Sequence, residues 1–277
     1  MELNVPLLDG LALTIADQPM GGEDYPTRRL QRGLLLVDRG DELAEEGVGF
    51  GVPVLKRGIQ TIFPGAVELT SRQVDGDRVV TAAFDMDLVE RLARPGRTPL
   101  RSRSLYAAKN ALAALHRRSP ALRGPLTTTS NALRRTFGWV TTFEKTQRVA
   151  TLTMVYVTRA GEGRVGVSLE PPVAPLAGVT EVVVMNEQGA RHFDRYEDAD
   201  GVALQGDEIG TWNEVAAARA SFVSTARGVA FSLGQVGGAR LDRGRELIGS
   251  RVAWSGFGYS LSPTLERFGY DLWIARV

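Results

Sequence analysis

Residues 140–158 read VTTFEKTQRVATLTMVYVT, and this stretch decides the fold. In its second half, Ala150, Leu152 and Met154 alternate with threonine or valine, which is the period-two pattern of a strand with one buried face. Valine, threonine, phenylalanine and tyrosine are also the residues that strands favour. The pattern therefore predicts one long strand over Val140–Thr158.

Shorter runs of the same type lie on both sides of this stretch, and each ends at Gly, Pro or an acidic turn, as strands of an antiparallel sheet do. Helices do not alternate regularly with them, and no repeat of 20–50 residues is present, which argues against βαβ winding and solenoids. The predicted strands are Leu11–Ile15, Gly33–Val37, Val48–Leu55, Thr61–Phe63, Ala66–Leu69, Arg78–Phe84, Arg164–Leu169, Val179–Met185, Val202–Leu204, Ala220–Val223, Gly228–Leu233, Arg251–Trp254, Tyr259–Leu261 and Tyr270–Arg276. We predict a mainly β fold: a large antiparallel β-sandwich, similar to a supersandwich, in a single domain over residues 1–277.

One helical excursion is predicted, at residues 87–137. Asp87-Leu-Val-Glu90 fits a capping box with Asp as the N-cap, and Pro95-Gly96 would end that short helix. A second helix is expected over Ser104–Arg118, where apolar residues recur every three or four positions. A third, short helix is expected from Ser130 to Phe137.

The composition excludes several kinds of chemistry. The 277 residues are 43% hydrophobic and 23% charged, as in soluble globular proteins. There is no Cys, so disulfides, thiolate nucleophiles and Cys-type zinc sites are impossible. The two histidines, His116 and His192, cannot form a three-His metal site, and three lysines against thirty arginines disfavour Schiff-base catalysis. Acid and base chemistry would therefore fall to carboxylates, Arg and Tyr.

The chain also lacks signals for export or membrane insertion. Its first ten residues carry Glu2 and Asp9 but no basic residue, and no stretch approaches the ~20 apolar residues of a spanning helix. We expect a cytoplasmic protein that does not bind membranes, and we expect no cofactor and no metal.

Charge is strongly segregated along the sequence. Residues 91–143, here called the basic segment, contain eleven basic residues and no acidic one. The other 224 residues hold 22 basic and 32 acidic residues, a net charge of −10. Nine of those acidic residues lie in residues 181–214, the acidic segment, which has only Arg191 and Arg195 as basic residues.

Two interpretations of this segregation stay open. In the first, the basic segment binds an anion, such as a phosphate or an acidic glycan, through Arg101, Arg103, Arg117, Arg118, Arg134 and Arg135. Alternatively, it docks on the acidic segment of the same chain or of a second subunit, which cancels both charges. The aromatic spacing of nucleic-acid-binding surfaces is missing, so nucleic acid is not the expected partner.

Two pairs of residues are candidates for catalysis. Asp85 and Asp87 would project from one face of a strand about 7 Å apart, a separation that suits paired carboxylates in glycoside chemistry. The alternative role for Asp87 is the helix cap. His192 and Asp194 would share one face of a strand with Tyr196, as a base and its orienting carboxylate would. Alternatively, His192 makes only a structural hydrogen bond.

Aromatic residues between glycines form a candidate platform. In Trp254-Ser-Gly256-Phe-Gly258-Tyr259, an exposed Trp254 and Tyr259 could stack on sugar rings. The alternative is that these aromatics, together with Trp273, are core, and that the glycines allow close approach of backbones or form bulges.

Two motif matches fail on context. Gly161-Glu-Gly163-Arg-Val-Gly166 matches the dinucleotide fingerprint, but a strand follows it where the fingerprint needs a helix, so we predict a hairpin turn over residues 159–163. Asp198-Ala-Asp200-Gly201 imitates a calcium loop, but Tyr196 stands at its first ligand position. A looser calcium or magnesium site of Asp194, Asp198, Asp200 and Asp207 competes with a solvated acidic turn.

The sequence does not specify a function, and two hypotheses remain. The first is a carbohydrate-directed protein that binds or, as an enzyme, processes an acidic or phosphorylated sugar with arginines, aromatics and carboxylates. The second is a non-catalytic module whose basic segment docks an acidic partner or a second copy of the chain. Convergence of the candidate carboxylates or His192 with Arg and an aromatic in one pocket would favour the enzyme.

Overall fold

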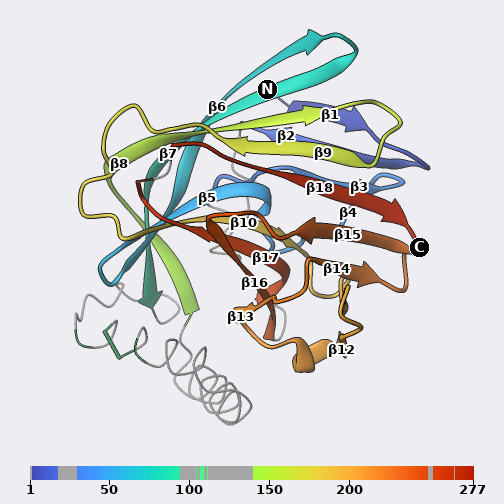
Figure 1. The fold of residues 1–277 in the computed structure, drawn as a ribbon. Coiled ribbons are helices and arrows are strands. Elements are labelled where there is room, and N and C mark those ends of the chain that lie inside the picture. The colour runs from blue at the N-terminus through green and yellow to red at the C-terminus, as the bar shows by residue number, and fades with distance from the viewer. Residues whose placement is uncertain are drawn as a thin grey trace.

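The computed structural model describes residues 2–17, 30–93, 140–248, 252–264 and 266–277, together with four isolated positions, 104, 107, 108 and 111. The described part is mainly β-structure (Figure 1). Its strands are β1 Glu2–Pro6, β2 Leu11–Ala16, β3 Leu35–Asp38, β4 Asp41–Glu42, β5 Gly49–Arg57, β6 Gln60–Val74, β7 Asp77–Ala93, β8 Val140–Thr158, β9 Arg164–Leu169, β10 Glu181–Gln188, β11 Arg195–Asp198, β12 Ala203–Gln205, β13 Asn213–Glu214, β14 Arg219–Ser224, β15 Val229–Gly234, β16 Ala239–Ile248, β17 Val252–Leu261 and β18 Phe268–Arg276, with a 3-10 turn, η3, at Gly206–Ile209.

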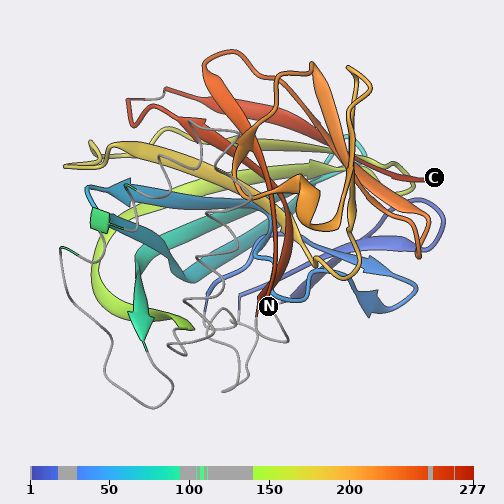
Figure 2. The same ribbon diagram turned by 90° about the horizontal axis from the view of Figure 1, so that it is seen from below.

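These strands form two antiparallel sheets. The small sheet has the order β1-β2-β3-β4, and the large one has the order β12-β11-β14-β15-β18-β9-β8-β7-β6-β5-β10-β17-β16-β13. The long strand predicted at residues 140–158 is β8, with the predicted bounds. Figure 2 shows the small sheet, drawn in blue, along one side of the large one. The predicted mainly β, antiparallel fold class is confirmed.

The large sheet bends so that its two halves pack face to face. Phe231 of β15 contacts Phe50 of β5, with ring centroids 5.1 Å apart, and Phe222 of β14 contacts Phe257 of β17 at 4.8 Å. The main core lies between the halves, and it also takes in Leu11 and Leu13 of the small sheet. Bending buries one face of each half, which makes the sheet a sandwich.

Strands β5 and β10 are buried on both faces, which explains why each contains an apolar run without alternation, Val52–Leu55 in β5 and Val182–Met185 in β10. One face contributes to the main core. On the other face Val52, Val54, Val183 and Met185 form a second apolar cluster with Leu30, Val48, Leu88 and Phe143. We call this second face of β5, β10, β17 and β16 the outer face.

A buried polar cluster joins the two halves inside the main core. The Oδ1 atom of Asn186 in β10 accepts hydrogen bonds from the Tyr270 hydroxyl of β18 at 2.6 Å and from the Gly51 N–H of β5 at 3.1 Å. The Tyr156 hydroxyl of β8 donates to the Gly51 carbonyl at 2.8 Å. Gly51 is the bulge residue between β5 and β10, with φ of 71°.

Replacing Tyr270 with Phe is expected to lower the free energy of unfolding by about 1–3 kcal/mol, because the ring still fills its space while the buried Asn186 loses one donor. Urea denaturation of the wild type and Tyr270→Phe measures this loss. Equal midpoints would contradict the role assigned to the hydroxyl.

The helix predicted to begin at Asp87 is wrong. Strand β7 continues through Asp87 to Ala93, because Val89, Leu92 and Ala93 find buried positions against neighbouring strands. Pairing and burial outweigh a local capping signal, whose contribution is about 1 kcal/mol. The isolated positions Ser104, Ala107, Ala108 and Ala111 are helical. The other residues of the expected excursion after residue 93 lie outside the described ones.

The two rejected motifs lie in turns, and the turn at residues 159–163 is the predicted one. Residues 159–163 connect β8 to β9, and the Glu162 N–H donates to the Arg159 carbonyl at 3.1 Å. Asp198 ends β11, and its Oδ1 accepts hydrogen bonds from the N–H groups of Asp200 and Val202. Within the described ranges, no helix has the length and apolar character needed to cross a bilayer.

Candidate functional site

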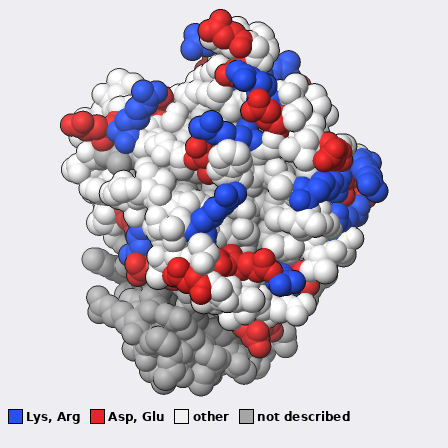
Figure 3. Space-filling model, turned by 45° about the vertical axis from the view of Figure 1, so that its right-hand side comes forward, with Lys and Arg blue, Asp and Glu red and all other residues white. Residues whose placement is uncertain are grey.

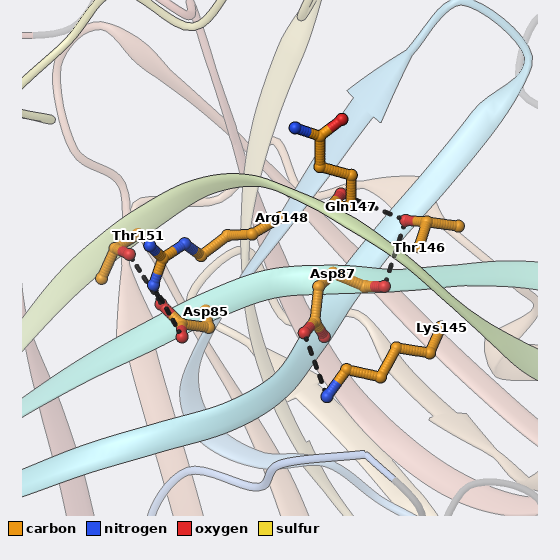
Figure 4. A network of polar contacts seen from close by, with 7 residues as sticks. All are labelled: Asp85, Asp87, Lys145, Thr146, Gln147, Arg148 and Thr151. Carbon is orange, nitrogen blue, oxygen red and sulfur yellow. Dashed lines mark hydrogen bonds and ion pairs between the residues drawn. The ribbon is translucent and has the colours of Figure 1, made fainter.

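The two aspartates predicted as a carboxylate pair lie on one face of β7. Met86 between them points into the main core, so Asp85 and Asp87 lie on the opposite face. Asp85 accepts hydrogen bonds from Arg148 at 3.0 and 3.1 Å and from the Thr151 hydroxyl at 2.6 Å, whereas Asp87 pairs with Lys145 at 3.5 Å (Figure 4). Each carboxylate therefore has its own cation.

Asp87 lies where both neighbouring strands break their register. On one side Met86 pairs with Ala150 and Leu88 pairs with Lys145, so four residues of β8 bulge opposite Asp87. On the other side β6 bulges at Gly65, where an added Cβ would lie 2.1 Å from the Asp87 Oδ1 atom. The Oδ1 atom is buried and accepts no hydrogen bond. This bulge places a buried, half-satisfied carboxylate in the middle of a sheet.

The predicted arrangement of His192, Asp194 and Tyr196 is wrong. His192 lies in the turn after β10, where its N–H donates to the Gly189 carbonyl, and not on a strand. Tyr196 is buried in the main core beneath the Arg243 guanidinium. The Asp194 carboxylate accepts a hydrogen bond from Gln205 at 3.5 Å. The turn geometry at Gly189 prevents His192 and Asp194 from sharing one strand face.

The structure places the two residues of the predicted aromatic platform, Trp254 and Tyr259, on opposite faces of β17. Tyr259 is wholly buried in the main core and donates its hydroxyl hydrogen to the Gly234 carbonyl, so it cannot be a platform. Trp254 lies partly exposed on the outer face, because strand alternation points it away from Tyr259. Trp273, expected in the core under the alternative, is 42% exposed.

Trp254 forms a stacked pair with Trp212, which follows η3 on the way to β13. The ring centroids are 4.9 Å apart and the ring planes differ by 21°. An added Cβ at Gly258 would lie 3.0 Å from the Trp212 ring, and one at Gly244 would lie 2.9 Å from the Trp254 ring. Two glycines thus let the tryptophan pair, Trp212 and Trp254, lie close to the sheet.

Trp212 also has strained backbone geometry, with φ of 55°. A bulky residue is rarely found in this left-handed region, and such strain persists only where the surrounding structure enforces it. Its sequence context contains no signal for this position, so the sequence could not identify Trp212 as a partner of Trp254.

Glu187 is a second residue that the motif search missed. It lies on β10 two residues after Met185, on the outer face, and is 5% exposed. Burial raises the pKa of Glu187 to about 8; a hydrogen bond from the Val48 N–H opposes this rise, and the nearby Glu246 carboxylate adds to it. The same Glu246 accepts a hydrogen bond from the Trp254 Nε1 atom at 3.3 Å, which places Glu187 close to the tryptophan pair. The signal in the sequence was a carboxylate two residues after the apolar run Val182–Met185.

The arginines predicted to bind an anion, Arg101, Arg103, Arg117, Arg118, Arg134 and Arg135, lie outside the described residues. Of the basic segment, Arg91 is described, and it pairs with Glu144 at 2.9 Å. In the acidic segment, Glu181 and Asp207 pair with Arg240 and Arg245 of β16. On the face drawn in Figure 3, described Lys and Arg side chains alternate with Asp and Glu.

An open hollow of about 500 Å³ lies at one end of β10, β16 and β17. Its cation, Arg240, is already paired with Asp242 at 3.0 Å and with Glu181 at 3.6 Å. The candidate carboxylates Asp85, Asp87 and Asp194 do not line this hollow. In the part of the chain that the structure describes, no three His, Asp or Glu side chains are grouped so as to hold a metal ion.

The fold of this chain is also found in solved structures of other proteins. The chain aligns over its whole length with the alpha-N-acetylgalactosaminidase NagBb from Bifidobacterium bifidum, at 10% identity, with a TM-score of 0.51 for the GalNAc complex and 0.52 for the Gal-NHAc-DNJ complex. The chain therefore shares the fold of the matching part of that enzyme.

The alignment covers 36% of NagBb, so the chain spans about a third of the length of that enzyme. It also aligns with the GH36 alpha-galactosidase AgaA from Geobacillus stearothermophilus, at 8% identity and a TM-score of 0.44, over 100% of this chain and 41% of that one. No protein-family model matches the sequence, and no curated protein matches it. At these identities the likeness establishes the fold alone.

Proposed function

We propose that this protein is carbohydrate-directed and binds an uncharged sugar ring on the tryptophan pair of the outer face. The observation that carries the proposal is the pair itself: two stacked, partly exposed indoles that lie close to the sheet because Gly244 and Gly258 leave room for them. Aromatic walls with a few polar groups are the usual composition of small-molecule sites. The strained backbone of Trp212 supports a functional role for this position.

Glu187 and Glu246 would supply the polar contacts. Below its pKa of about 8 Glu187 is protonated, so its O–H can donate a hydrogen bond to a sugar oxygen at neutral pH. Glu246 accepts a hydrogen bond from Trp254 and holds that indole in place. The Glu246 carboxylate beside the indoles disfavours an anion, so the sugar proposed here is neutral.

An acidic or phosphorylated sugar would need cations near its charge. The arginines that prompted that hypothesis belong to the basic segment, and the six that we named lie outside the described residues. The alternative function, an interaction module for an acidic partner or a second copy, rests on the same segment, and no contact in the described ranges favours it over sugar binding.

N-acetylgalactosamine is the first probe, because one structurally similar enzyme is described in complex with it. Saturation-transfer NMR and tryptophan fluorescence are expected to detect binding to the wild type. Trp254→Ala and Trp212→Ala are each expected to weaken it at least tenfold, because each removes one indole of the pair.

Asp85→Asn serves as the matched control, since Asp85 lies in an exposed ion pair on β7 and does not contact the tryptophan pair. It is expected to bind the probe like the wild type. Unchanged binding in both tryptophan variants, or equal losses in all three, would contradict the proposed site. Galactose and glucose, tested in parallel, determine which ring the site prefers.

A further inference from the structure

A second aromatic surface lies on the opposite side of the sandwich, on β14, β15, β18 and β9. Ser221 pairs with Ser232, Ser232 with Trp273, and Trp273 with Arg164, so these four residues form a row across the four strands. Their neighbours Phe222, Phe231, Ile274 and Val165 are buried in the main core. By strand alternation the row therefore faces outward.

The indole of Trp273 lies between two guanidinium groups. The Arg164 Cζ atom is 5.6 Å from the ring centroid, and the Arg219 Cζ atom is 5.7 Å from it. Trp273 is nevertheless 42% exposed. Among the described residues of these four strands, no other large apolar side chain is exposed.

The two arginines differ in their electrostatic partners. Arg164 pairs with Asp271 at 3.0 Å, and the hydrogen bond that Arg164 donates to the Asp271 carboxylate raises the Arg164 pKa. Arg219 is exposed and stacks on Trp273, and among the described residues it has no carboxylate partner. Arg164 thus has carboxylates near it, Asp271 and Glu162, whereas Arg219 can form a two-pronged contact with an incoming carboxylate.

We infer that Trp273, Arg219 and Arg164 form a binding surface for a saccharide that carries a carboxylate, such as a uronic acid. The ring would stack on Trp273, its carboxylate would meet Arg219, and the hydroxyl pair of Ser221 and Ser232, 2.8 Å apart, would contact sugar hydroxyls. The surface is distinct from the tryptophan pair of the outer face, so the inference does not depend on the neutral-sugar proposal.

The composition of this surface argues against a protein partner or a second copy. Around Trp273 the outward positions other than Val223 are small or polar, including Gly234, Ala230 and Ala275. A stable protein interface needs several apolar or aromatic anchors with a polar rim, and one indole between two cations does not provide them.

The test compares D-galacturonate with D-galactose, which differ at C6 by a carboxylate. Saturation-transfer NMR at low and high salt measures both dissociation constants. The wild type is expected to bind galacturonate through this surface, and Arg219→Gln and Trp273→Ala are each expected to weaken that binding at least tenfold. Thermal melts of both variants confirm that they are folded.

Arg267→Gln is the matched control, because it removes the same charge from an exposed arginine that pairs with Glu170 at the far end of β18. It is expected to bind like the wild type, as is Trp254→Ala. Unchanged binding in Arg219→Gln, or an equal loss in Arg267→Gln, would overturn the inference. A dimer in the wild type that Trp273→Ala dissociates would also overturn it, since the surface would then be an interface between two copies.

Discussion

Replacing Glu187 with Gln is expected to remove a large part of the pH dependence of folding between about pH 5 and pH 8. Glu187 is buried on the outer face, and its pKa is raised from an ordinary value of 4.5 to about 8 by burial first and by Glu246 second. Between those two values the folded chain keeps a proton that the unfolded chain has lost. The free energy of unfolding therefore falls as pH rises, by about 1.4 kcal/mol per pH unit from this group.

The direction of the Glu187 pKa shift determines whether the free energy of unfolding rises or falls with pH. A carboxyl group whose pKa is raised on folding contributes no penalty below pH 4.5, where both states are protonated, and its full penalty above pH 8, where the folded state must ionise it. Gln has a similar shape and is neutral at every pH. The stability gained by Glu187→Gln over the wild type is therefore expected to grow from pH 5 to pH 8, to several kcal/mol, and then level off.

Urea denaturation at four pH values between 5 and 9 measures this difference. Glu68→Gln is the control, since Glu68 is exposed on β6 and its replacement is expected to leave the profile nearly parallel to that of the wild type. A constant offset between wild type and Glu187→Gln would show that Glu187 ionises normally, and the polar role proposed for it beside the tryptophan pair would then fail.

Replacing Gly256 with Ala is expected to destabilise the protein by about 3 kcal/mol, because β10 and β17 approach each other too closely for a side chain. Gly256 pairs with Glu187, and an added Cβ would lie 2.0 Å from the Asn186 carbonyl oxygen and 2.7 Å from the Glu187 Cα atom. Both are backbone atoms, so no rotamer change relieves the clash. The strands must separate, which disturbs the outer face at Glu187.

Gly269→Ala is the control for this prediction. Gly269 is a strand glycine of β18, and an added Cβ would meet its nearest atoms at 3.5 and 3.6 Å, which are ordinary contacts. Its replacement is expected to change the unfolding free energy by less than about 0.5 kcal/mol. Similar midpoints for Gly256→Ala and Gly269→Ala would show that the β10–β17 spacing adjusts easily.

The fold class was predictable because its signals are local. Alternation over residues 150–156, glycines at turns and the absence of regular helices all act over a few residues. The same holds for the turn at residues 159–163 and for the close backbone approach at Gly256, which follow from the chemistry of glycine itself.

The site was less predictable because its residues meet through pairing across the sheet. Trp254 was a candidate from its own segment, but Trp212 joins it from a different connection, and Gly244 and Gly258 make room from two strands. Asp87 has a convincing capping pattern, yet the register of β6 and β8 keeps it in a strand. A pattern of neighbouring residues in the sequence does not show which residues of other strands will pack against it.

The sequence by itself determined that this chain is a β-rich antiparallel protein without cysteine chemistry, because composition and periodicity do not depend on which strands become neighbours. Tertiary structure alone decided that Tyr259 is buried, that Trp273 is exposed and that Glu187 holds its proton to about pH 8. These outcomes depend on how the large sheet bends, since the bend decides which face of each strand meets the other half and which faces water.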